Sequence, residues 1–176
     1  MAELDQETLA RREAALAEVR VYGDPALRSS ARPVERFDAT LEAEVERMTG
    51  LLGDALGAGL AATQLGIMHR VFVYRAEPEA PIAVMVNPEL EWQSEERELD
   101  EEGCLSLPGV WVEVERAAQV RFRGHDARGR ARVIEAEGME ARVLQHELDH
   151  LDGVLILDRT SREARRDAVR RLTGRG

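Results

Sequence analysis

The chain has 176 residues, a formal net charge of −10 and a single cysteine. This length suits one domain with a buried core, which we expect to cover residues 1–176. No apolar run approaches the roughly 20 residues that span a bilayer, and the acidic N-terminus resembles neither a signal nor a transit peptide. Because a lone cysteine forms no internal disulfide, a reducing cytoplasm is the simplest compartment. The negative charge argues against DNA binding.

Helical patterns lie at both ends of the chain, and strand patterns lie between them. An Ala-rich charged segment and an amphipathic segment predict two helices, over residues 4–19 and 39–57, with Gly57 ending the second. Runs rich in Val, Ile and aromatic residues predict strands at 70–75, 82–86, 110–115, 118–124 and 131–136. Two further helices are predicted at 139–151 and 161–173. This order of elements indicates an α+β domain.

The run Gln145-His146-Glu147-Leu148-Asp149-His150 places two imidazoles one helical turn apart. Positions i and i+4 project from the same face of a helix, so His146 and His150 can bind one metal ion. Glu147 then lies close enough to take a proton from water held by that metal. The alternative is a solvated helix face with two incidental histidines. The apolar residues of the same helix argue against that alternative: Val143, Leu144, Leu148 and Leu151.

A catalytic site of this kind usually has a third protein ligand and one open position. The metzincin pattern would need a histidine where this chain has Ile156, and Glu163 lies in an arginine-rich tail. Cys104 is the better third ligand, although a lone cysteine is often just a small buried apolar residue. Its neighbours Gly103, Ser106 and Pro108 suggest a shaped loop. A thiolate ligand would suit iron(II) as well as zinc, nickel or cobalt.

Three segments in order resemble the signature motifs of peptide deformylases. They are Gly57-Ala58-Gly59-Leu60-Ala61-Ala62-Thr63-Gln64, Glu102-Gly103-Cys104-Leu105-Ser106 and the His146 run. The resemblance covers about residues 21–159 and implies antiparallel sheets packed around a central metal-binding helix. It also implies a bacterial enzyme that removes the formyl group from the N-terminal formyl-methionine of nascent polypeptides. Residues 1–20 then form a helical extension, and 159–176 a basic C-terminal helix.

The resemblance assigns roles to single residues. Cys104, His146 and His150 would bind the metal, expected to be iron(II), and Glu147 would be the general acid and base. Gln64 and the backbone N–H of Leu105 would stabilise the negative charge on the formyl oxygen. The peptide groove would be lined by Gly57, Ala58, Gly59 and Gly103. We expect the substrate backbone to pair there as an added strand, which small residues permit by allowing close approach.

Three further residues, Trp111, Asp149 and Asp152, can each be interpreted in two ways. Trp111 either rims the groove or packs in its strand, and its residue type favours packing. Asp149 and Asp152 either support the metal ligands or occupy solvated or helix-end positions, and we favour the latter. Two other functions stay open on the residues alone. One is a metallopeptidase that cleaves internal bonds, and the other is a deformylase-like fold that only binds.

The C-terminal tail is basic: between residues 159 and 176, seven arginines face two acidic residues. One reading is a solvated amphipathic helix packed by Ala164, Ala168, Val169 and Leu172. The other, which the resemblance suggests, is that this helix docks on ribosomal RNA near the exit tunnel.

Overall fold

The structure is a computed structural model, and it describes residues 4–174. Its α-helices are α1 (Gln6–Glu18), α2 (Ala39–Ala55), α3 (Gly138–Leu151) and α4 (Arg162–Thr173). The short 3-10 helices are η1 (Pro25–Arg28), η2 (Ala62–Leu65) and η3 (Ile156–Asp158). The strands are β1 (Gly59–Ala61), β2 (Val71–Tyr74), β3 (Ala83–Gln93), β4 (Arg97–Gly103), β5 (Trp111–Ala117), β6 (Gln119–His125) and β7 (Ala131–Glu137).

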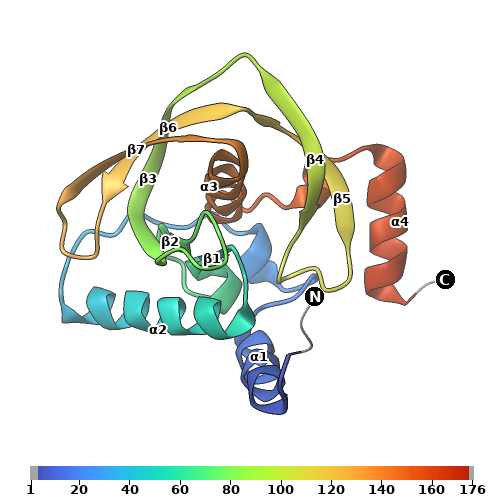
Figure 1. Ribbon diagram of the computed structural model, residues 1–176, viewed down its shortest axis with the longest axis horizontal. Coiled ribbons are helices and arrows are strands. Elements are labelled where there is room, and N and C mark those ends of the chain that lie inside the picture. Colours follow the sequence, from blue (N-terminus) through green and yellow to red (C-terminus); the bar gives the residue numbers. More distant parts are fainter. Residues whose placement is uncertain (1–3, 175–176) are drawn as a thin grey trace.

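The strands form two antiparallel sheets. Five strands pair in the order β1-β2-β3-β6-β7, and β4 pairs with β5 in a separate hairpin. Figure 1 shows α3 near the centre of the molecule, with β3 to β7 arching around it and α4 outside β5. The architecture confirms the α+β class and the central helix. No helix within residues 4–174 is long and apolar enough to cross a membrane.

Helix α3 is buried because its apolar residues pack in one core cluster with residues of the five-stranded sheet. Leu144 and Leu151 are fully buried and pack in one cluster with Phe72 of β2 and Phe122 of β6. Gln145 fastens the helix to the end of β5: its amide donates to the carbonyl of Ala117 and accepts from the Ala117 N–H, at 3.0 and 3.1 Å. The orientation of α3 about its own axis is therefore fixed.

The predicted helices and strands are present, with four differences. Strand β3 extends well beyond the predicted 82–86, and β1 and β4 were not predicted. Strand β4 carries five charged residues in seven, so it lacks the apolar alternation that indicates a strand. Helix α2 ends at Ala55, and its left-handed C-cap residue, with φ 57°, is Leu56 and not the predicted Gly57.

Two glycines permit a matched test of this backbone. Gly153, after α3, has φ +73°, and a Cβ there would lie 2.7 Å from the carbonyl oxygen of Arg28. We expect Gly153→Ala to lower the free energy of unfolding by at least about 2 kcal/mol. Gly50 lies exposed within α2 with open space around it, so Gly50→Ala should raise that free energy by about 0.5–1 kcal/mol. Urea denaturation measures both, and equal effects would contradict the structure.

Candidate functional site

The two histidines of the predicted motif lie on one face of α3, as their spacing requires. The Nε2 atoms of His146 and His150 are 3.2 Å apart, and the ring planes meet at 65°. His146 holds its other nitrogen, Nδ1, 2.9 Å from a carboxylate oxygen of Glu102. That contact is a hydrogen bond when Nδ1 carries the proton, which leaves Nε2 of His146 with a free lone pair.

Cys104 completes the cluster from a different part of the chain. It follows β4 directly, and its Sγ lies 3.2 Å from Nε2 of His150. The sulfur and the two ring nitrogens all lie within 4.8 Å of one another. Burial lowers the pKa of His150 well below its usual range and so keeps the ring neutral, as coordination requires. One thiol and two imidazoles that converge in this way fit a tetrahedral divalent metal with one open position.

Glu147 is almost fully buried beside this cluster, with 3% of its surface exposed. Burial raises the pKa of its carboxyl to about 7, although the neighbouring His146 acts in the opposite direction. One carboxylate oxygen, Oε2, has no hydrogen-bond partner within residues 4–174. A carboxyl group with a pKa near neutrality can both accept and return a proton.

Gln64 is held by both ends of its amide. Its oxygen accepts from the N–H of Ala61 at 2.9 Å, and its nitrogen donates to Oγ of Ser106 at 3.0 Å. The same nitrogen lies 3.7 Å from Sγ of Cys104. Gln64 occupies the short helix η2 directly after β1 and is 1% exposed. The amide is therefore a fixed donor at the edge of the Cys-His-His cluster.

A cavity of about 640 Å³ opens over the cluster. Its wall includes all four predicted groove residues, Gly57, Ala58, Gly59 and Gly103, together with Leu105. Strand β1 is the last strand of its sheet, so one of its edges is free to pair with an extended peptide. Trp111 also lines the cavity with 65% of its surface exposed, so the favoured prediction of a packed strand residue is wrong.

The groove glycines are explained by this chain's own side chains. A Cβ on Gly59 would overlap the carboxylate of Glu147, and one on Gly103 would lie 3.0 Å from the ring of Trp111. A Cβ on Gly57 would meet a side-chain carbon of Leu52 at 2.9 Å. The sequence-based reason, close approach of a substrate backbone, is therefore not the only one. These glycines make room for the base and for the cavity wall.

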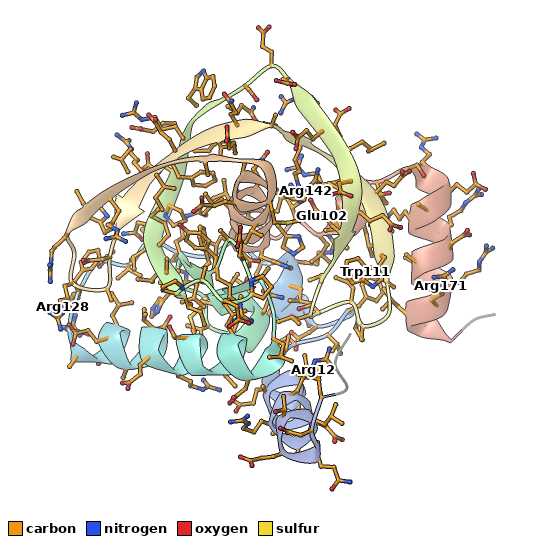
Figure 2. The ribbon with its side chains drawn as sticks, in the orientation of Figure 1. Arg12, Glu102, Trp111, Arg128, Arg142 and Arg171 are labelled. Carbon is orange, nitrogen blue, oxygen red and sulfur yellow. The ribbon has the colours of Figure 1, made fainter. Side chains whose placement is uncertain are left out.

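A buried network of charged residues supports the cluster from behind. Arg116 of β5 donates to both carboxylate oxygens of Glu102, at 2.9 and 3.0 Å, and to Asp149 at 2.6 Å. Arg142 of α3 donates to Glu102 at 2.8 Å, and Arg159 donates to Asp149 at 2.7 Å. Burial opposes ionisation of Glu102, but Arg116 and His146 hold its pKa well below the usual range. Figure 2 shows Glu102 and Arg142 together near the centre of the molecule.

Sequence reasoning missed most of this network. Asp149 is 8% exposed and bound to two arginines, so the preference for a solvated or helix-end position is wrong for it. Asp152 does occupy the helix end, where it caps α3 and pairs with Arg70 at 2.7 Å. The position of Arg142, one helical turn before His146, could have predicted that both side chains lie on the same face of α3. Nothing in the sequence predicted the buried position of Arg116, since a lone arginine in a strand is usually exposed.

Comparison with known proteins decides the family. The family described as polypeptide deformylase matches residues 16–166. The peptide deformylase of Thermotoga neapolitana is 50% identical over 141 residues, which cover 80% of this chain and 85% of that protein. That of Acidothermus cellulolyticus is 42% identical and covers 89% and 85%. The crystal structure of the Legionella pneumophila peptide deformylase superposes with a TM-score of 0.84 at 38% identity, covering 89% and 92%.

The chain belongs to the peptide deformylase family. As a peptide deformylase it is a hydrolase that removes the N-terminal formyl group of nascent polypeptides. The family is one of metalloenzymes, and Cys104, His146 and His150 are the metal-binding group that the geometry offers. The two alternatives, a peptidase of internal bonds and a protein that only binds, are set aside by this membership.

Removing one partner from the buried network of this deformylase should be strongly destabilising, because it leaves buried charges uncompensated. Arg116→Met would leave Glu102 and Asp149 short of a buried partner, and we expect a loss of about 3–5 kcal/mol in the free energy of unfolding. Arg123→Met, which removes an exposed strand arginine paired with Glu89, is the matched control and should leave the urea midpoint nearly unchanged. Equal midpoints for the two variants would contradict the network's role.

Proposed function

We propose that Cys104, His146 and His150 hold one divalent metal ion, and that Glu147 is the general acid and base of deformylation. One observation carries the proposal: the sulfur of Cys104 and one ring nitrogen each of His146 and His150 lie within 4.8 Å of one another, beside a buried carboxyl group whose pKa is about 7. The fixed amide of Gln64 at the same point adds a donor for developing negative charge.

The metal, when bound, lowers the pKa of water and polarises the formyl oxygen. Glu147 then takes a proton from the attacking water and delivers it to the nitrogen of the departing methionine. Its high pKa serves both steps because the gain and the loss of the proton are nearly balanced. The side-chain amide of Gln64 and the N–H of Leu105 donate to the formyl oxygen as negative charge develops there. The products are formate and a free N-terminal methionine.

The substrate backbone lies in the cavity along residues 57–59 and Gly103. The free edge of β1 supports this placement, because an extended peptide can add to it as a further strand. Arg75 strengthens the wall from outside: its side chain donates to the carbonyl of Gly57, and its N–H donates to that of Ala58, both at 2.9 Å. The groove is therefore held in shape before the peptide arrives.

Iron(II) is the proposed native metal, following the family expectation. A single thiolate with two imidazoles accepts iron(II) and also zinc, nickel or cobalt, so the donor set alone does not choose between them. The cytoplasm is the proposed compartment, since both a free thiol ligand and a nascent formylated substrate belong there.

Glu147→Gln tests the chemistry directly. Formate release from a formyl-Met-Ala-Ser peptide should fall by at least about a hundredfold, because the amide cannot carry the proton. Gln64→Leu should also lower kcat by about a hundredfold through loss of the oxyanion donor. Both proteins are purified without oxygen and analysed for metals. One equivalent of iron in Glu147→Gln, as in the wild type, separates lost proton transfer from lost metal, whereas full activity without Glu147 would contradict its role.

We propose in addition that α4 contacts the ribosome. One face of α4 packs on β5 through Ala168, Val169 and Leu172, and the opposite face is exposed and basic. Figure 2 shows Arg171 on that outer face, and Arg128 on the far side of the molecule. A concentrated positive face on an acidic protein is suited to RNA phosphates.

Exchange of four exposed α4 arginines for alanine, at Arg165, Arg166, Arg170 and Arg171, should abolish co-sedimentation with ribosomes at moderate salt. The same exchange at four exposed arginines elsewhere is the matched control: Arg36, Arg97, Arg128 and Arg130. We expect the control variant to sediment like the wild type. Unchanged sedimentation of the α4 variant would contradict ribosome docking without bearing on deformylation.

A further inference from the structure

Most of helix α1 lies outside the part of the chain that matches the family, yet the helix forms part of the cavity wall. The family match begins at residue 16, and α1 spans Gln6–Glu18. Arg12 and Leu16 of this helix line the same cavity as Cys104 and His146. In Figure 2, Arg12 extends from α1 on the side toward Trp111, which is another residue of the wall. The extension is thus placed against the substrate site.

The helix is held firmly in this position. Val19, directly after α1, packs in the core cluster that includes Met48 and Leu52 of α2, and Ala15 is also buried. Glu18 forms an ion pair with Arg47 of α2. The N–H of Arg20 donates to the backbone carbonyl of Gln64 at 2.7 Å, which ties the end of the extension to the residue proposed to stabilise the oxyanion.

Arg12 is the member of this wall that can recognise charge. It lies one helical turn before Leu16, so both side chains project from the same face of α1. Within residues 4–174 no carboxylate oxygen comes within 4.0 Å of its guanidinium nitrogens, and the side chain is exposed. The other arginine of the wall, Arg142, is buried and already bound to Glu102. Arg12 is therefore the free guanidinium of the cavity among the described residues.

We propose that Arg12 is a specificity-determining residue that binds an acidic side chain of the substrate downstream of formyl-methionine. The inference rests on the proposed function, because it needs the formyl group to lie at Cys104, His146 and His150. The residues after methionine must then pass the solvent-exposed part of the cavity wall, to which Arg12 belongs. Glu101, exposed on β4, lines the same cavity and favours the opposite charge. Arg12 and Glu101 thus act oppositely on the charge of the substrate, and Arg12 supplies the preference for acidic residues.

Three formyl-methionyl tripeptide amides test the proposal, with both following residues Glu, Lys or Ser. Amidation removes the terminal carboxylate, so only side chains differ in charge. In Arg12→Glu, the ratio of kcat/KM for the Glu peptide to that for the Lys peptide should fall at least about fivefold, mainly through KM. The fall should shrink at about 1 M salt, where the screening length is only about 3 Å.

Arg11→Glu is the matched control. Arg11 is exposed on the same helix, contacts Thr8 at 3.4 Å and does not line the cavity, yet its exchange changes the net charge equally. Its ratio should stay within about twofold of the wild type. An unchanged ratio in Arg12→Glu, or an equal fall in both variants, would overturn the inference. The Ser peptide keeps the two claims apart: if the wild type releases no formate from it, the proposed function itself fails.

Discussion

Burying the carboxylate of Glu102 between two arginines and a histidine constrains three elements at once. Glu102 is the next-to-last residue of β4, Arg116 lies on β5, and Arg142 and His146 lie on α3. An uncompensated carboxylate at this depth would cost several kcal/mol, so these elements are stable together only in the arrangement that satisfies it. That arrangement places Cys104, two residues after Glu102, against the histidines of α3. The geometry of the Cys-His-His cluster is therefore a consequence of how a buried charge is neutralised.

The same burial gives the two acidic residues of the site opposite properties. Glu102 is surrounded by guanidinium groups and an imidazole, and it stays ionised because its pKa is held low. Glu147 is just as deeply buried, but no arginine of residues 4–174 forms an ion pair or hydrogen bond with it, and its pKa rises to about 7. A permanently charged carboxylate orients His146, and a neighbouring carboxyl is free to exchange a proton. The hydrogen-bond partners, more than the depth of burial, separate the two roles.

The sequence predicted what depends on local spacing and left out what depends on partners in space. The helix that carries His146 and His150 follows from an i, i+4 pattern, and the elements of the α+β fold follow from apolar periodicity. Strand β4 could not be predicted from its charged sequence. It is a strand because it pairs with β5, and its Glu102 is buried because Arg116 of β5 donates a hydrogen bond to it. Asp149 was misjudged for the same cause: its partners come from β5 and from the loop after α3. Ligand chemistry and the weakness of other candidates pointed to Cys104, whereas the motif resemblance supplied Gln64 and the groove residues, which spacing alone would not.

The packing around Gly59 explains why we expect selectivity among peptides to depend on the part of the cavity wall that α1 forms. Near the reacting group, space is taken by this chain's own side chains: the carboxylate of Glu147 occupies the place of a Cβ on Gly59, and Trp111 occupies that on Gly103. Changes there would disturb the base or the wall, so little variation is tolerable. Another part of the wall is built by exposed Arg12 and half-buried Leu16 of α1, a helix that lies mostly outside the family match and is anchored through Val19 and Arg20. An element attached in this way can alter which peptides enter without moving any atom of the Cys-His-His cluster.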